Sequence, residues 1–432
     1  MLLVLRNLSH CLNDVELKID MKNRIFGIIL FSLVVNIGSA FAQNHRTYDS
    51  YKGLVMAGYQ GWFNTPTDGV NRNWKHYGGK QGFKPGSCNI DLWPDVSEYN
   101  ITYKTEFSFA DGCSAKVFSS ADESTVFTHF LWMKEYGIDG VFMQRFVSEI
   151  KNTQGLSHFN KVFNSAMLAA QKYDRAICVM YDLSGMKQGD AAFVLSDMDN
   201  LAAKYNITTH KKCPSYLYHN RKPLVCIWGV GFNDKRAYSL EDANQLIDGL
   251  RKRGYSIMIG VPTRWRELTN DAVRDSALHA TIKKCDILMP WFVGRYDEKS
   301  YPTFSTLIPK DLQWCKANKI DYAPLVFPGF SWKNMKGEQT KQIYRNGGNF
   351  FWSQISGAIQ ANCEMLYVAM FDEMDEGTAI FKCATEVPVG ASKFVSLEKN
   401  PGNDHYLWLT GQAAKMLRKE IPLSIELPTR KK

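Results

Sequence analysis

A dense group of acids lies in the C-terminal part of the chain, where Asp372, Glu373, Asp375 and Glu376 directly follow an apolar run. Like charges this close disfavour one another's ionisation, so at least one of these carboxyl groups should have a raised pKa. Hydrolysis of a glycosidic bond needs a protonated acid beside an ionised one. Residues three positions apart point the same way on a helical turn, so Glu373 and Glu376 are the expected pair. A sharp turn at Gly377 would follow them. A solvated surface turn and a calcium-binding loop are the alternative interpretations.

Apolar runs and helical patterns alternate from residue 54 onward, and each run is nearly continuous, as a strand buried on both faces should be. The expected strands are Leu54–Tyr59, Ile138–Met143, Ile177–Asp182, Leu224–Trp228, Ile257–Val261, Ile287–Trp291, Tyr322–Phe327 and Leu366–Phe371. The expected helices include Asp122–Tyr136, Leu156–Lys172, Ala191–Tyr205, Leu240–Arg253, Trp352–Asn362 and Tyr406–Arg418. Repeated β–α units predict an α/β protein with a (β/α)8 TIM barrel. No linker divides the chain, so we expect a single domain. A doubly wound sheet is the alternative, but the glycine-rich turn that often follows its first strand is missing.

Polar and aromatic residues follow the expected strands, at the C-terminal ends where barrels place their active sites. Candidates for hydrogen bonds to sugar hydroxyls are Tyr59, Gln60, Gln144, Asp182 and Arg264. Candidate platforms for sugar rings are Trp228, Trp291 and Trp332, because an indole has a flat apolar face and a polar edge. Arg345 could neutralise a carboxylate or bind an acidic sugar. Each of these residues also has a structural alternative, such as a core ring, a surface ion pair or a strand cap.

Several segments resemble the glycoside hydrolase family 71/99-like group, which includes the endo-α-mannosidases. These segments are Leu54–Phe63 (LVMAGYQGWF), Asp91–Tyr99 (DLWPDVSEY), Tyr136–Phe142 (YGIDGVF), Phe371–Ile380 (FDEMDEGTAI) and His405–Arg418 (HYLWLTGQAAKMLR). The similarity extends from about residue 52 to residue 420, and the acidic motif is its most specific part. The resemblance implies a (β/α)8 fold, no metal or other cofactor, and cleavage of an α-linked glycan with retention of configuration.

The acidic motif of the endo-mannosidases, Glu-x-x-Glu-Gly, falls on Glu373, Glu376 and Gly377. The resemblance implies that Glu373 takes the proton of the substrate 2-hydroxyl, whose oxygen attacks C1 and gives a 1,2-anhydro sugar. Glu376 would protonate the leaving oxygen and then deprotonate the water that opens the epoxide. Between the acids the family has an aromatic residue and a His, whereas this chain has Met374 and Asp375. The motif therefore indicates the type of reaction more strongly than the identity of the sugar.

Two alternatives to this enzyme remain open from the sequence. One is a catalytically silent glycan-binding barrel that lost turnover through the altered motif. The other is an exo-acting glycosidase of the xylosidase or arabinosidase type, acting on plant glycans.

The N-terminal segment has the pattern of an export signal. Lys22 and Arg24 precede an apolar run that ends in Ala40-Phe41-Ala42, a typical cleavage site. We therefore expect an upstream extension over residues 1–20, a signal peptide over residues 21–42, and a catalytic domain over residues 43–432. The mature protein would be secreted or periplasmic and would have no membrane span, because the apolar run is too short for one.

Charge and cysteine content exclude other classes of protein. The net charge is +9, and apart from the terminal Arg430-Lys431-Lys432 there is no basic run, so nothing indicates nucleic-acid binding. No His/Cys group has the spacing of a metal site. Cys178 and Cys226 lie in apolar runs and should be buried, whereas Cys88 and Cys113 flank a loop and could form a disulfide.

Overall fold

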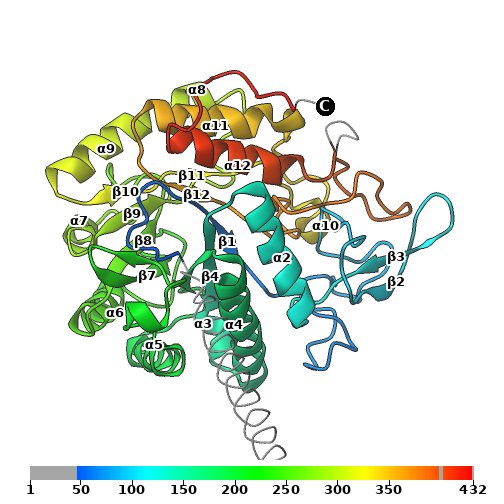
Figure 1. Ribbon diagram of the computed structural model, residues 1–432, viewed down its shortest axis with the longest axis horizontal. Helices are drawn as coiled ribbons and strands as arrows, with labels where there is room; N and C mark the ends of the chain where they lie inside the picture. The colour runs from blue at the N-terminus through cyan, green and yellow to red at the C-terminus, as the bar shows by residue number, and fades with distance from the viewer. Residues whose placement is uncertain (1–45, 398–401, 431–432) are drawn as a thin grey trace, which may run out of the picture. The chain divides into compact units, whose positions relative to one another are not determined.

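Parallel strands form the centre of the structure (Figure 1), and most of their residues are buried, as the continuous apolar runs predict. The strands of this sheet are β1 (Val55–Tyr59), β4 (Gly140–Phe146), β5 (Ala176–Asp182), β7 (Lys222–Trp228), β8 (Ser256–Val261), β9 (Ile287–Pro290), β10 (Asp321–Tyr322), β11 (Leu325–Val326) and β12 (Leu366–Val368), with the short β6 (Tyr218–His219) antiparallel to β7. The order of the parallel strands is β11, β12, β1, β4, β5, β7, β8, β9 and β10.

The sheet closes into a barrel through the short segment from Asp321 to Val326. Its first part, β10, pairs in parallel with β9, and its second part, β11, pairs in parallel with β12. β10 and β11 are therefore two halves of one interrupted strand, and the sheet has eight strand positions in a closed ring. This confirms the expected (β/α)8 barrel.

The computed structural model describes residues 46–397 and 402–430, which belong to one unit that begins at Arg46. The expected upstream extension and signal peptide lie outside these described residues. Among the residues that are described, no helix is long and apolar enough to cross a membrane.

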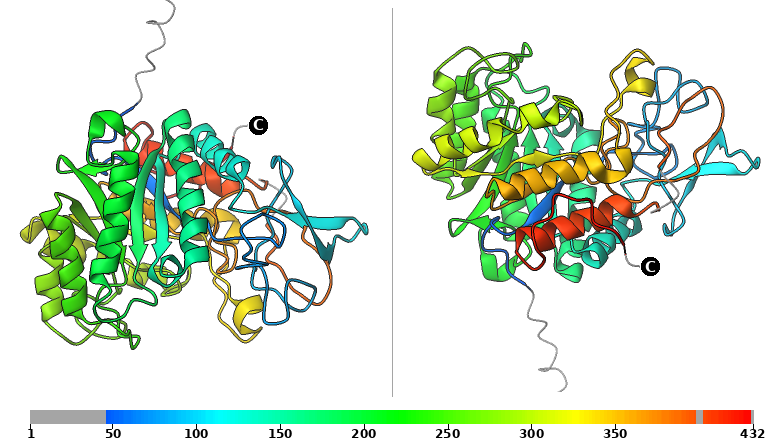
Figure 2. Two further views of the ribbon diagram at one scale, coloured as in Figure 1. Left: turned by 90° about the horizontal axis from the view of Figure 1, so that it is seen from below. Right: turned by 90° about the horizontal axis from the view of Figure 1, so that it is seen from above.

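Each strand position is followed by a helix that packs on the outside of the barrel (Figures 1 and 2). These helices are α2 (Glu123–Tyr136), α4 (Thr153–Tyr173), α5 (Ala191–Tyr205), α6 (Leu240–Lys252), α7 (Ala277–Ile282), α9 (Leu307–Ala317), α11 (Asn349–Gln360) and α12 (His405–Leu417). All six helices named from the sequence are present. Local signals fix some of their ends: Ser239 and Asp242 form a capping box at the start of α6.

Two long loops at the C-terminal ends of the strands pack together. The first connects β1 to α2 and contains the hairpin of β2 (Tyr103–Ser108) and β3 (Ser114–Val117). The second connects β12 to α12 and lies beside the first in both views of Figure 2, where the loops are blue to cyan and orange. Backbone bridges join them at Pro94 and Cys383 and again at Ser108 and Val389. The second loop carries the acidic segment, so these bridges help to fix its position.

The disulfide that Cys88 and Cys113 could form is not present, because both thiols are free. Cys88 is buried, with its sulfur 3.3 Å from the hydroxyl oxygen of Ser392, whereas Cys113 is exposed beside the β2–β3 turn. Cys178 and Cys226 are fully buried in β5 and β7, as expected from their apolar surroundings.

Candidate active site

A cavity of about 410 Å³ lies at the C-terminal ends of the barrel strands. Most of the site residues expected from the sequence line it: Gln60, Gln144, Asp182, Trp228, Trp291, Trp332, Glu373 and Glu376. The register of the sheet explains part of this arrangement, because Phe146, Asp182 and Trp228 are paired across neighbouring strands and end at the same level. Residues that are far apart in the sequence therefore face one space.

The acidic segment is the tip of a tight loop and not a helical turn. After β12 the chain turns back on itself, and Phe371 and Met370 pair through their backbones with Phe381 and Ile380. The amide of Gly377 donates to the carbonyl oxygen of Met374 at 3.2 Å, which closes a turn around Asp375 and Glu376. Gly377 has a φ of 65°, a conformation that glycine adopts without strain. The turn brings both glutamates to the cavity.

Glu373 is a buried carboxyl group held by two donors. The amide nitrogen of Gln60 donates to one carboxyl oxygen, and the hydroxyl of Thr378 donates to the other at 2.6 Å. Burial raises the pKa of Glu373 well above its ordinary value, the charges of Glu376 and Asp375 raise it further, and the two donors oppose the rise. These donors favour the ionised form of Glu373, against the larger effect of its burial.

Glu376 is partly exposed to the cavity, and its backbone is anchored where Ser331 donates to its carbonyl oxygen at 2.8 Å. Burial raises the pKa of Glu376 to about 8, and the charge of Asp375 contributes to the rise. The indole of Trp332 and the ammonium group of Lys336 act in the opposite direction. A carboxyl group with this pKa carries a proton at neutral pH, which is the state that a general acid needs.

Asp372 is a structural anchor. Its carboxylate accepts hydrogen bonds from the backbone amides of Gln60 at 2.7 Å and Gly61 at 2.9 Å. Burial raises the pKa of Asp372 to about 7, and these two amides limit the rise. The residue ties the acidic loop to the end of β1 and so positions Gln60 against Glu373.

Asp375 points away from the cavity and contacts His76. Its carboxyl oxygen lies 2.9 Å from Nδ1 of His76, and the His76 ring stacks on Trp62 at 3.8 Å between centroids, with planes inclined by 6°. Burial raises the pKa of Asp375 to about 8 and lowers the pKa of His76 to about 3. At neutral pH the pair is therefore uncharged, with its proton on Asp375. It supports Trp62, which lines the cavity.

Met374 lies in the core and does not reach the cavity. Its carbonyl oxygen accepts the backbone amide of Asp91 at 2.9 Å. The carboxylate of Asp91 in turn accepts the amides of Lys333 at 2.7 Å and Asn334 at 2.9 Å, at the start of α10 (Lys333–Lys336). Asp91 thus connects the acidic loop to the segment that carries Trp332.

Aromatic side chains form much of the cavity wall. Trp228 and Trp291 meet edge to face, with centroids 5.2 Å apart and planes at 70°. Phe232 lies 4.9 Å from Trp228, and the guanidinium of Arg236 lies over the Trp228 ring at 4.9 Å. Rings with one open face can stack on sugar rings.

Three residues expected at the site do not line the cavity. Tyr59 is fully buried and points toward α2, where its hydroxyl lies 2.7 Å from Nδ1 of His129. The backbone amide of Arg264 donates to Asp271 at 3.0 Å, outside the cavity lining. Arg345 supports the acidic loop from behind, because its guanidinium donates to the carbonyl oxygens of Gly377 and Ala379.

Sequence reasoning also missed residues that line the cavity: Trp62, Phe146, Ser184, Phe232, Asp234, Arg236, Val293, Gly294, Arg295 and Phe330. Trp62 directly follows Gln60 and Gly61 in the segment after β1, so its position was a usable signal. Phe146 is the last residue of β4, and the others lie in loops without a periodic pattern. No group of His, Cys, Asp and Glu residues suited to a metal ion occurs in residues 46–397 and 402–430.

Comparison with known proteins reveals similarity in structure but not in sequence. The sequence matches no family model and no curated protein. Two solved structures of a GH99 endo-α-mannosidase from Bacteroides thetaiotaomicron are similar to the chain, one of them in complex with bis-tris-propane. They are 15% and 14% identical to it, and each match covers 86% of this chain and 99% of that chain, with a TM-score of 0.59. At this identity the likeness concerns the fold, and the chain has the (β/α)8 fold of these structures.

Proposed function

We propose that this chain is a glycoside hydrolase that cleaves an α-linked oligosaccharide or polysaccharide with retention of configuration. The observation that carries the proposal is the pair Glu373 and Glu376, which face one aromatic-walled cavity with raised pKa values. Two carboxyl groups in different environments are the requirement of glycoside hydrolysis. The acidic motif and the fold shared with an endo-α-mannosidase support an α-linked substrate.

The first step forms a 1,2-anhydro sugar. Glu373 takes the proton of the sugar 2-hydroxyl, and the freed oxygen attacks C1 while the bond from C1 to the leaving oxygen breaks. Glu376 gives its proton to that oxygen. In the second step, Glu376 takes a proton from water, the water oxygen attacks C1 while the C1–O2 bond of the epoxide breaks, and Glu373 returns its proton to O2. Two inversions at C1 give net retention.

The cavity contains polar groups and aromatic ring faces that can bind a neutral sugar. Gln144 and Asp182 offer polar groups along one side, and Trp228, Trp291 and Trp332 offer ring faces. Asp375 is neutral and lies behind Trp62. Glu373 and Glu376 are therefore the acids of the 372–376 segment that contact the substrate.

Export is part of the proposal and rests on the pattern of residues 21–42. All nine cysteines of the described residues are free, and only Cys113 is exposed. Burial raises the pKa of the thiols of Cys88 and Cys213 to about 11, which makes them poorly reactive.

The test compares the mature protein with its Glu373→Gln and Glu376→Gln variants on α-mannans, α-glucans and mixed plant glycans. We expect hydrolysis by the wild type, products with the α-configuration when first released, and losses of at least about 100-fold in both variants. A substrate that lacks the 2-hydroxyl should not be cleaved. Undiminished activity in either variant would refute the roles assigned here. Binding of a glycan without cleavage by the wild type would favour the silent binding protein.

A further inference from the structure

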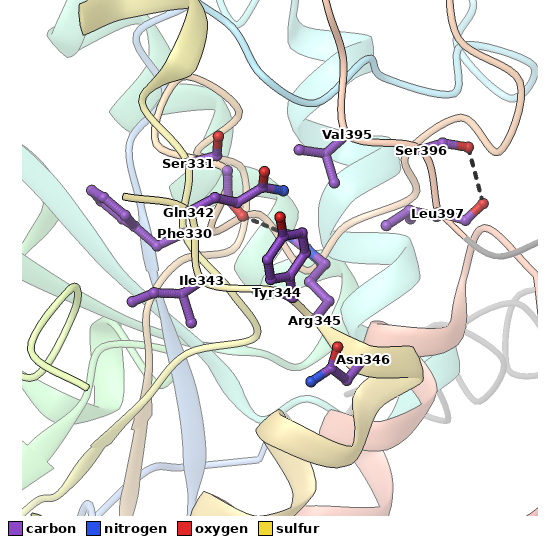
Figure 3. A pocket seen from close by; sticks show the side chains of 11 residues that line it. Phe330, Ser331, Gln342, Ile343, Tyr344, Arg345, Asn346, Val395, Ser396 and Leu397 are labelled. Carbon is purple, nitrogen blue, oxygen red and sulfur yellow. Dashed lines mark hydrogen bonds between the residues drawn. The ribbon is translucent and has the colours of Figure 1, made fainter. Parts of the chain in front are cut away.

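A second, smaller pocket of about 110 Å³ lies on the outer side of the segment that follows β11 (Figure 3). Phe330 lines both this pocket and the cavity of the candidate active site. The two pockets therefore lie on either side of one residue. The other walls of the smaller pocket are Gln342, Tyr344 and Asn346 on one side and Val395, Ser396 and Leu397 on the other.

The alternation of an extended segment places Gln342 and Tyr344 on the outer face. Ile343 exchanges two backbone hydrogen bonds with Phe330, at 2.8 and 3.0 Å, so the chain is extended at this point. Ile343 and Arg345 point inward and are buried, whereas Tyr344 points outward and is 62% exposed. In Figure 3 the Tyr344 ring and the Gln342 amide lie on the same side of the segment.

The exposure of Tyr344 is unusual for this protein. The chain has 56 aromatic residues, from 11 Trp, 20 Tyr and 25 Phe, yet the strongly exposed large apolar side chains of the described residues include only two aromatic ones, Tyr344 and Phe193. Neither the Tyr344 hydroxyl nor the Gln342 amide has a hydrogen-bond partner within the described residues. An open ring face beside free polar groups is the combination that binds a sugar ring and its hydroxyls.

The pocket is held rigidly with respect to the proposed catalytic acids. The Arg345 guanidinium donates to the carbonyl oxygens of Gly377 at 2.9 Å and Ala379 at 2.6 Å. Ser331, next to Phe330, donates to the carbonyl oxygen of Glu376 at 2.8 Å. The two contacts of Arg345 use one nitrogen of its guanidinium, and Arg345 also lines the pocket, which has no carboxylate in its lining.

We propose that Tyr344 and Gln342 form an accessory site for a stretch of glycan chain that extends beyond the cavity. This inference rests on the proposed function, and it assigns the enzyme a chain longer than the cavity holds. It favours action within chains over removal of terminal sugars.

The experiment measures retention in gels that contain α-mannan, α-glucan or a mixed plant glycan, with Glu376→Gln as the parent so that the polymer is not consumed. Adding Tyr344→Ala should weaken retention by the best-bound polymer about fivefold. Adding Phe193→Ala, which removes the other exposed ring, on α5, should leave retention unchanged. The loss from Tyr344→Ala should be larger for the polymer than for a trisaccharide of the same linkage.

Equal retention of the three proteins overturns the accessory site, and so does a failure of every polymer to retain the parent. Hydrolysis is measured separately with the wild type. A polymer that is retained through Tyr344 but never cleaved would keep the accessory site and refute the proposed function. Cleavage of a polymer whose retention is unchanged by Tyr344→Ala would keep the proposed function and refute the accessory site.

Discussion

Gly260 in β8 provides a test of the Trp228 platform by a substitution that does not touch the platform itself. Gly260 pairs with Trp228 across the sheet. A Cβ atom at position 260 would lie 2.4 Å from Cδ1 of Trp228, 3.1 Å from its Cγ and 3.2 Å from Cε of Met289. An ordinary carbon contact is about 3.5 Å, so Gly260→Ala must displace the indole by about 1 Å. Met289 can move its terminal methyl group more easily.

We expect Gly260→Ala to fold and to lose activity. The indole is partly exposed and can tilt into the cavity. This movement relieves the strain and displaces the platform. A misplacement of about 1 Å in a substrate-positioning group can cost up to about 100-fold in rate. We therefore expect kcat/KM to fall roughly 10- to 100-fold, which corresponds to about 1.4 to 2.7 kcal/mol.

The assay is a double-mutant cycle with Trp228→Ala, measured by kcat/KM on the best polymer of the panel. In the Trp228→Ala background the indole is absent, so adding Gly260→Ala should cost little more. Thermal unfolding of all four proteins checks that the variants are folded. The reasoning is refuted if Gly260→Ala keeps full activity, or if it loses as much activity without Trp228 as with it.

Three further substitutions probe the acidic loop. Asp375→Asn keeps a donor for His76 and removes a carboxyl group that ionises near pH 8, in the same range as Glu376, and whose charge then raises the pKa of Glu376. The basic limb of the kcat/KM profile should therefore move down by up to about one pH unit. The same variant should be more stable near pH 8. The folded pKa of Asp375, about 8, exceeds its unfolded value of 3.8, so the folded wild type binds more protons than the unfolded chain between these values and loses stability as pH rises through this window. The difference in Tm between Asp375→Asn and the wild type should therefore shrink toward pH 4. Thr378→Val removes a donor to the Glu373 carboxylate and should raise the acidic limb of kcat/KM by about one unit. Arg345→Met removes the donor to both Gly377 and Ala379, so it should lower the free energy of unfolding by about 2 kcal/mol, measured by urea denaturation.

Asp199→Asn is the matched control for the charge effect, because Asp199 forms an exposed ion pair with Arg253 far along the sequence from the loop. It should leave both limbs of the pH profile in place. A basic limb that stays unchanged in Asp375→Asn would mean that Glu376 does not supply the proton. An acidic limb that is unchanged in Thr378→Val would contradict the assignment of Glu373 as base.

The barrel and much of the cavity were predictable because both depend on local signals. A strand buried on both faces appears as a continuous apolar run, and the residue that follows it must lie at the rim. Gln60, Asp182 and Trp332 could be assigned in this way. The same logic failed at Tyr59, because alternate side chains on a strand face opposite directions and the hydroxyl of Tyr59 reaches His129 in the helix layer.

Other parts of the site depend on contacts between distant segments, which no local pattern encodes. His76 reaches Asp375 across 299 positions of the sequence. Arg345 was a candidate for binding an acidic sugar at the cavity, but it lies behind the loop, where one nitrogen of its guanidinium donates to two carbonyl oxygens. The thiols of Cys88 and Cys113 flank one loop in sequence, yet one packs in the core and the other is exposed. Such residues can be assigned only when the loops that carry them have been placed.

The structure also explains how four acids can occupy five positions of one loop. Asp372 accepts two backbone amides, Glu373 accepts two side-chain donors, and Asp375 shares its proton with His76. Glu376 has the fewest such contacts and a pKa raised to about 8. Each acid thus has a different surrounding, so their mutual repulsion is relieved by protonation at some positions and by hydrogen bonds at others. Asp375, which differs from the endo-mannosidase motif, consequently adds no charge to the cavity at neutral pH. The Glu373–Glu376 pair keeps the asymmetry that acid–base catalysis requires.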